Sequence, residues 1–113
     1  MAENNASAAR IVLTTTANLE EANRLGRILV EERLAACATL IPAVESIYAW
    51  KGKVETSSET LLMLKTGSDQ LAALESRVHQ LHSYETPEFL VLCVEAGSEA
   101  YLAWMFSGLG APK

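Results

Sequence analysis

One loop of the sequence carries side chains that could hold a metal ion. His82 and Glu88 offer an imidazole nitrogen and a carboxylate oxygen, six residues apart. Imidazole suits Cu²⁺ and Zn²⁺, so both residues are candidate ligands of a divalent cation. Their spacing is not a recognised chelating pattern, unlike two histidines one helical turn apart. The alternative is that His82 caps a helix and hydrogen-bonds locally.

A second set of residues is aromatic or charged and flanks a turn at Lys51-Gly52. Tyr48 and Trp50 are two residues apart, so they project from the same face of one strand. Glu59 and Lys65 also share a face, on the strand that follows the turn. These side chains could form a polar and aromatic surface along a hairpin.

Patterns typical of catalysis are missing from the sequence. It has no P-loop, no G-x-G-x-x-G, no nucleophile elbow and no H-E-x-x-H. Cys37 and Cys93 lie in apolar, strand-like stretches, and we interpret both as buried free thiols rather than a disulfide or a metal pair. We therefore expect a protein without enzymatic activity and without catalytic residues.

Hydrophobic periodicity predicts the elements that position these side chains. We expect strands over residues 11–16, 36–50, 54–65 and 89–94, and helices over residues 19–34, 67–81 and after Ser98. With right-handed crossovers, this order is the split β-α-β pattern of a ferredoxin-like sandwich, an α+β fold with a C-terminal helix. Helices would cover one face of an antiparallel sheet, with Tyr101 and Trp104 packing the last helix onto it.

Local signals refine these predictions. Asn18 resembles an N-cap, with Glu21 as its reciprocal carboxylate. Pro42 predicts a bend, a bulge or an exposed edge in the second strand, because proline donates no ladder hydrogen bond. Gly52 is free to take a positive φ at the hairpin turn, which would place Trp50 opposite Lys53.

Composition limits the classes of function. The chain has 113 residues, of which 50% are hydrophobic and 20% charged, so we expect one domain over residues 11–113 after a disordered tail at 1–10. Its formal charge is −5 and no basic patch stands out, which argues against nucleic-acid binding. The longest apolar runs are too short to span a membrane and the first ten residues lack a signal sequence, so we expect a cytoplasmic protein.

Two features favour an assembly of several copies. The predicted strand over residues 54–65 would be about 40 Å long. The diameter of a compact chain of this size is about 34 Å, so the hairpin should project beyond its own core. Residues 89–94 do not alternate apolar with polar, so both faces of that strand need cover. We predict a homo-oligomer; the alternative is a monomer whose own helices wrap the second face.

Several stretches together resemble the CutA family of divalent-ion tolerance proteins. They are residues 33–38, 46–55, 64–66, 82–88 and 101–104. The most specific are Tyr-x-Trp-x-Gly-Lys from Tyr48 and His-x-Tyr-Glu-x-Pro-Glu from His82, and the resemblance runs in order from Ile11 to Trp104. It implies a homotrimer of ferredoxin-like subunits, similar in arrangement to the PII signalling proteins.

The resemblance also implies a role in tolerance of copper and other divalent ions, and some members are described as binding Cu²⁺. This chain departs from the family pattern at three positions. Thr14 stands where some members have a cysteine, Leu81 where some have a histidine, and Ser83 where a proline is more common. A metal site here would therefore be weak, exchangeable or shared between subunits.

Five residues match recurrent family positions: Tyr48, Trp50, Glu59, Lys65 and Tyr84. One interpretation is a pocket between subunits that receives a small anionic or amphipathic ligand, in a PII-like signalling or binding module. The other is an interface held by aromatic anchors and a charge pair. The sequence specifies neither the physiological ligand nor the pathway and partner proteins.

Overall fold

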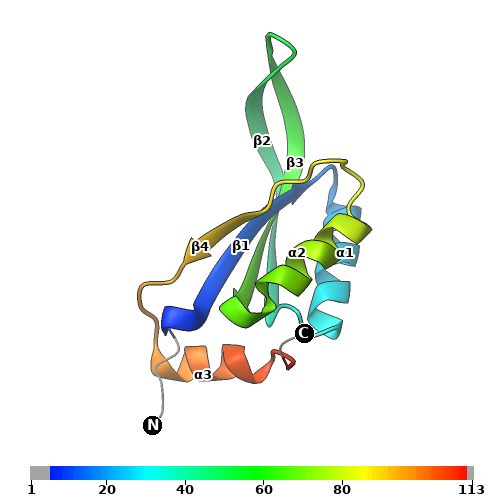
Figure 1. Ribbon diagram of the computed structural model, residues 1–113. Helices are drawn as coiled ribbons and strands as arrows, with labels where there is room; N and C mark the ends of the chain where they lie inside the picture. The colour runs from blue at the N-terminus through cyan, green and yellow to red at the C-terminus, as the bar shows by residue number, and fades with distance from the viewer. Residues whose placement is uncertain (1–5, 112–113) are drawn as a thin grey trace.

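The strands form a single antiparallel sheet in the order β2-β3-β1-β4. The computed structural model describes residues 6–111. Its elements in chain order are η1 (Ala6–Ala8), β1 (Ala9–Thr16), α1 (Leu19–Glu31), β2 (Cys37–Trp50), β3 (Lys53–Gly67), η2 (Ser68–Gln70), α2 (Leu71–Leu81), β4 (Leu90–Cys93) and α3 (Glu99–Ser107) (Figure 1). The predicted ferredoxin-like sandwich is confirmed. No helix within residues 6–111 is long and apolar enough to cross a membrane.

Helices α1 and α2 cover one face of the sheet (Figure 1). Val12 of β1 and Leu62 and Leu64 of β3 point to this side and are fully buried. The helices contribute Leu25, Leu29, Leu74 and Val78 to the same core. In each helix the two named residues are four apart, so helical periodicity accounts for the buried side of both helices.

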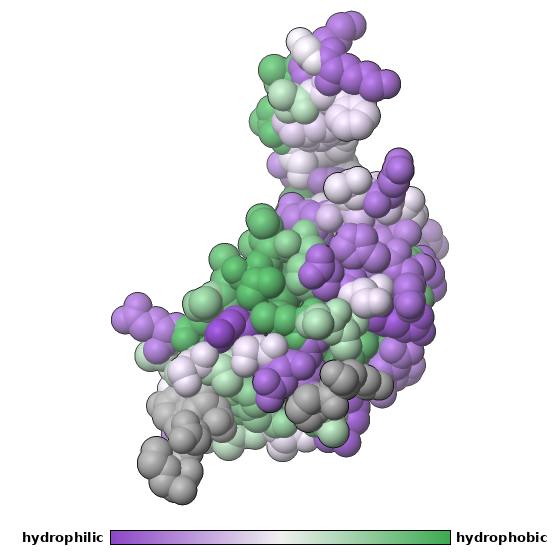
Figure 2. Space-filling model, in the orientation of Figure 1, coloured by the Kyte–Doolittle hydropathy of each residue, from purple (hydrophilic) through white to green (hydrophobic). Residues whose placement is uncertain are grey.

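The opposite face of the sheet is apolar but largely uncovered. Alternate residues of β1 and β3 lie here, including Leu13 and Met63, and they are only partly buried. Leu90 and Leu92 of β4 pair with β1 on this side and are 56% and 46% exposed. Figure 2 shows the resulting apolar surface over β4 and the neighbouring part of the sheet. We call this surface the open face.

The β2–β3 hairpin extends beyond the rest of the molecule (Figure 1). With the hairpin included, the molecule measures 53 × 25 × 21 Å. Trp50 pairs with Lys53, as predicted. Lys51 and Gly52 form the turn with φ of 51° and 78°. Two consecutive positive φ values are typical of the two-residue type I′ turn, whose twist matches that of the flanking strands. The prediction that the hairpin projects beyond its own core is confirmed.

The irregularity predicted at Pro42 is a bulge in edge strand β2. The register with β3 shifts between Ile41 and Val44, and Ala43 takes a φ of 61°. A missing N–H is tolerated at an edge strand, so two of the three predicted alternatives, the bulge and the exposed edge, are confirmed.

Helix α1 is shorter than predicted: it ends at Glu31, not Leu34. Arg33 takes a φ of 62°, and the Leu34 N–H donates to the carbonyl of Leu29 at 3.0 Å. This is a left-handed C-terminal cap of the kind that usually uses glycine. The Arg33 guanidinium also donates to the carbonyls of Ser107, Gly108 and Leu109, so contacts with the C-terminal segment support this conformation.

At both ends of the chain the structure differs from the sequence predictions. Residues 6–10 of the predicted disordered tail are structured, because Ala9 is buried against Leu102 and Met105 of α3; residues 1–5 lie outside the described part. Tyr101 and Trp104 do not pack α3 onto the sheet. They are 44% and 52% exposed, because the helix turns its other side inward. Strand β4 is limited to Leu90–Cys93.

The cysteines are free thiols, as expected, but the prediction that both are buried was wrong. Cys37 is half-buried on edge strand β2. Cys93 is exposed because β4 forms the other edge of the sheet.

Candidate functional site

The predicted metal loop begins at His82, where α2 ends. Its side chain is fully buried and both ring nitrogens are engaged. Nδ1 accepts the backbone N–H of Tyr84 at 3.0 Å, which leaves the hydrogen on Nε2, 2.7 Å from the carbonyl oxygen of Thr15. Nε2 therefore donates to that carbonyl, and the ring is a neutral imidazole that ties the loop to β1.

A carboxylate from α1 holds the same loop. Asn18 caps α1 as predicted, accepting the Glu21 N–H at 2.8 Å, but Glu21 does not return a capping bond to Asn18. Its carboxylate instead accepts the Ser83 N–H at 2.8 Å and the Ser83 hydroxyl at 2.9 Å, and it lies 3.6 Å from His82 Nδ1. Burial acts to raise the pKa of Glu21, but the two hydrogen bonds from Ser83 outweigh it and hold the pKa below its usual value.

These contacts fit a structural role better than a metal site within one chain. Glu88 is half-buried, and within residues 6–111 no group of three His, Cys, Asp or Glu side chains could hold an ion. The fully buried hydroxyl of Thr14 has no hydrogen-bond partner among residues 6–111, yet a hydroxyl is a poor substitute for a thiolate toward copper. The residues present therefore do not fit a resident copper ion.

Tyr84 links the loop to the hairpin. Its hydroxyl donates to Glu59 Oε2 at 2.8 Å, and its ring lies 4.8 Å from that of His82. Burial and, after it, the hydrogen bond to Glu59 raise the pKa of Tyr84 above its usual range. Two of the five predicted cleft residues are thus brought together and satisfy one another.

The other three predicted cleft residues lie apart from that pair. Tyr48 shares a hydrogen bond of 2.7 Å with Ser57 on the hairpin. Trp50 is 59% exposed near the tip, and Lys65, at the far end of β3, donates to Thr39 at 3.0 Å. Tyr48, Trp50, Glu59 and Lys65 share one side of the hairpin ladder, but within one chain the five residues do not converge on a single pocket.

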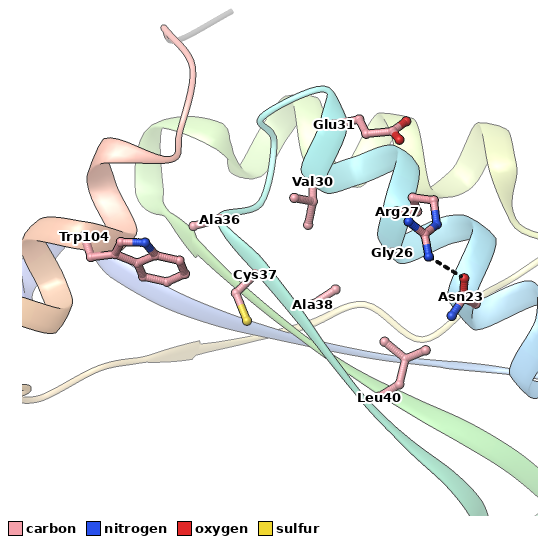
Figure 3. Close-up of a pocket in the computed structure, with 10 residues that line it drawn as sticks. All are labelled: Asn23, Gly26, Arg27, Val30, Glu31, Ala36, Cys37, Ala38, Leu40 and Trp104. Carbon is pink, nitrogen blue, oxygen red and sulfur yellow. Dashed lines mark hydrogen bonds between the residues drawn. The ribbon is translucent and has the colours of Figure 1, made fainter.

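The structure contains a groove that the sequence did not predict. It has a volume of about 420 Å³ and lies between α1, the start of β2 and the ring of Trp104 (Figure 3). Its lining comprises Asn23, Gly26, Arg27, Val30, Glu31, Ala36, Cys37, Ala38, Leu40 and Trp104. Most of these residues come from the neighbouring segments 23–31 and 36–40, whereas Trp104 lies far along the chain, and together they follow no local motif. The sequence predicts that Trp104 packs the last helix onto the sheet, so it gives no signal for this groove.

The sequence model described as "CutA1 divalent ion tolerance protein" matches residues 10–107. The chain belongs to this family. The matched range contains the predicted metal loop, the hairpin and the groove.

Relatives and solved structures agree with this assignment. "Divalent-cation tolerance protein CutA" of Thermus thermophilus is 40% identical over 100 residues, which are 88% of this chain and 97% of that protein. "Protein CutA, chloroplastic" of Arabidopsis thaliana is 40% identical over 95 residues, which are 84% of this chain; the chain spans about half of that protein, 52%. The crystal structure of CutA1 from Oryza sativa superposes with a TM-score of 0.91 at 35% identity, covering 96% of this chain and 98% of that chain.

Proposed function

We propose that the protein is a non-enzymatic homotrimer that acts in tolerance of divalent metal ions, copper among them. Membership of the divalent ion tolerance family supports the role. The observation that supports an assembly of several copies is the open face, where Leu90 and Leu92 are about half exposed. Monomeric proteins rarely leave a contiguous apolar surface of this kind uncovered. The projecting hairpin provides a second surface for other copies, in an arrangement similar to that of PII proteins.

The assembly is tested by native mass spectrometry and sedimentation across a range of concentrations. We expect three times the mass of one chain under both methods. A monomer at micromolar concentration contradicts the proposal, and a dimer refutes the predicted number of copies.

Direct copper binding by His82 and Glu88 stays a prediction, and the contacts of the loop predict that it is weak. An ion at either ring nitrogen of His82 would have to displace a hydrogen bond to Thr15 or Tyr84. Titration of metal-free protein with Cu²⁺ in a calorimeter should give a small, saturable heat that His82→Gln and Glu88→Gln both reduce.

His79 provides the matched control for this titration. It is a second histidine on the same helix, exposed, with Nδ1 at 2.9 Å from the Glu75 carbonyl. His79→Gln should leave the heat unchanged. A heat lost only in His79→Gln, or no saturable heat at all, would contradict copper binding at the loop.

A second candidate function is a binding module that uses a cleft between subunits. The supporting observation is that Trp50 is 59% exposed in a single chain, on the same side of the hairpin as Tyr48, Glu59 and Lys65. Trp50 is a fluorescence reporter once Trp104 is replaced by phenylalanine. A screen of nucleotides and organic anions should then contain one that shifts the Trp50 emission saturably, and a screen without one counts against this function.

We also propose a cytoplasmic location. Cys37 and Cys93 are both free thiols, which suits a reducing compartment. The relative named as chloroplastic shows that the family also operates in organelles. Imaging of a fluorescent fusion in the source cells tests this proposal, and export of the fusion contradicts it.

A further inference from the structure

The hairpin loses the support of the sheet at one level. The last pair between β1 and β3 is Thr16 with Thr60, so the part of β3 before Thr60 pairs with β2 alone. At the same level, the register between β2 and β3 shifts between Ile41 and Val44. Beyond it, residues 44–59 form a two-stranded extension, which we call the arm (Figure 1). A ribbon of two strands is marginally stable by itself and twists more than a wider sheet, so the sheet alone does not fix the direction of the arm.

The root of the arm has the backbone features of a hinge. Pro42 and Ala43 of β2 together lie opposite the single residue Thr60 of β3, and none of the three has a partner in the register of these two strands. Pro42 has no N–H to donate, and Ala43 takes a φ of 61°. A β-bulge of this kind bends its strand and interrupts the ladder. A change in the backbone angles here would swing the arm without disturbing the pairs inside it.

One side chain ties the arm to the body of the molecule. The Tyr84 hydroxyl donates to Glu59 Oε2 at 2.8 Å, and Glu59 is the first β3 residue on the arm side of the bulge. Within residues 6–111, no other hydrogen bond joins the arm to a segment outside the hairpin. Figure 1 shows the loop between α2 and β4 crossing the base of the hairpin. The bond therefore acts where the arm leaves the sheet.

Tyr84 can hold the arm because its own loop is fixed to two other elements. His82 Nε2 donates to the Thr15 carbonyl at 2.7 Å, which joins the loop to β1. Ser83 donates to the Glu21 carboxylate of α1 through both its backbone N–H and its hydroxyl. Tyr84 is half-buried, and its ring lies 4.8 Å from that of His82. The tyrosine is therefore held independently of the arm.

We propose that the hydrogen bond between Tyr84 and Glu59 sets the direction of the arm, so that the arm meets neighbouring copies in one orientation. Tyr84 is thus a positioning residue, which acts through Glu59 and needs no bound ion. Holding a segment in its bound orientation lowers the ordering cost of association. The role in association rests on the proposed homotrimer, whereas the direction of the arm within one chain does not.

The test uses Trp50, near the tip of the arm, as a fluorescence reporter in full chains that carry Trp104→Phe. In dilute, dissociated protein, Tyr84→Phe should speed the decay of the Trp50 fluorescence anisotropy, because the arm then swings on its hinge. During refolding from urea, the same variant should slow the concentration-dependent association step by about tenfold. The concentration-independent folding step should not change. If the chain never associates, the role in association is refuted, and the anisotropy alone decides whether Tyr84 holds the arm.

Tyr48→Phe provides the matched control. It also removes a hydrogen-bonded tyrosine hydroxyl, but that hydroxyl bonds to Ser57 within the arm at 2.7 Å, so the variant should leave the anisotropy and the association rate unchanged. Glu59→Gln keeps an oxygen that can accept from Tyr84 and should have a small effect, whereas Glu59→Ala should match Tyr84→Phe.

A double variant that combines Tyr84→Phe with Glu59→Ala tests whether the two side chains act as a pair. It should associate no more slowly than either single variant, because each substitution already removes the bond. Additive losses in the double variant would overturn the proposal. Equal changes in Tyr48→Phe and Tyr84→Phe, or no change in Tyr84→Phe, would overturn it as well.

Discussion

The two faces of the sheet are built from similar residues, but one face is buried and the other is partly exposed. Along β3, Leu62 and Leu64 are fully buried under the helices, whereas their neighbours Leu61 and Met63 lie on the open face and stay partly exposed. The strand is apolar on both sides, so its sequence does not distinguish the faces. What distinguishes them is that one chain supplies enough helix to cover only one face.

The two faces also differ in how their polar side chains are hydrogen-bonded. On the helix side, the hydroxyl of Thr66 donates to the Leu34 carbonyl at 2.8 Å, and Glu21 is satisfied by Ser83. On the open face, Lys65 has only neutral acceptors among the described residues. The helix side is therefore largely buried and hydrogen-bonded within one chain, with the Thr14 hydroxyl as an exception among the described residues, whereas the open face lacks apolar cover and a counter-charge.

The largest expected effect is on the free energy of unfolding, and it compares two adjacent residues of β3 that lie on opposite faces. Leu64→Ala should lower the free energy of unfolding by about 2–5 kcal/mol at any protein concentration, because it creates a cavity in the core. Met63→Ala should cost little in dilute, dissociated protein and more as the concentration rises and copies cover it. Urea unfolding at several concentrations measures both. Equal, concentration-independent losses would mean that the open face is not an interface.

A smaller effect is expected on how the free energy of unfolding depends on acidic pH. The depressed pKa of Glu21 contributes stability above the unfolded carboxyl pKa, about 4.3, and that stability is lost as the pH falls through the folded pKa. Ser83→Ala removes one hydrogen bond to the carboxylate, so it should cost about 1 kcal/mol at pH 7 and less at pH 3. Urea unfolding at the two pH values tests this, with Glu21→Gln as the variant that lacks the titrating group. A loss that is the same at both pH values would exclude the carboxylate as its cause.

The smallest effect concerns two fully buried threonines of the helix side. Thr14→Val removes a hydroxyl without a hydrogen-bond partner and should stabilise the fold by up to about 1 kcal/mol. Thr66→Val removes a hydroxyl that is bonded to Leu34 and should destabilise it by about the same amount. Thermal unfolding of the pair measures the contrast. Destabilisation by both variants would indicate that Thr14 has a partner, such as a buried water.

The order of elements and the hairpin register were predictable because they depend on local signals. The turn at Lys51-Gly52 sets the pairing of Trp50 with Lys53, and helical spacing marks the buried stripe of α2. The end of α1 was not predictable. Its cap uses Arg33 instead of glycine, and its carbonyl partners lie at Ser107–Leu109, far along the chain.

The candidate sites were also predictable only where local sequence signals define them. Spacing placed Tyr48 and Trp50 on one side of the hairpin, but it could not show that Tyr84 reaches Glu59 while Lys65 lies at the other end of β3. His82 Nδ1 accepts from the nearby Tyr84, but Nε2 donates to Thr15, a partner that only the tertiary structure brings close. The groove joins Arg27, Cys37 and Trp104, and no local pattern connects them.

The central position of β1 has a consequence for how the protein is made. This strand precedes both of its partners in the chain, and Ile11 pairs with Lys65 on one side and with Leu92 on the other. A nascent chain therefore carries an apolar strand without its first partner until β3 has left the ribosome. The second edge of β1 stays open until β4 has emerged as well. Such late, non-local pairing slows folding and leaves a strand edge available to other chains. Neighbouring ribosomes on one messenger RNA would hold identical open edges close together, so a chaperone that shields residues 9–16 during translation would benefit this chain most.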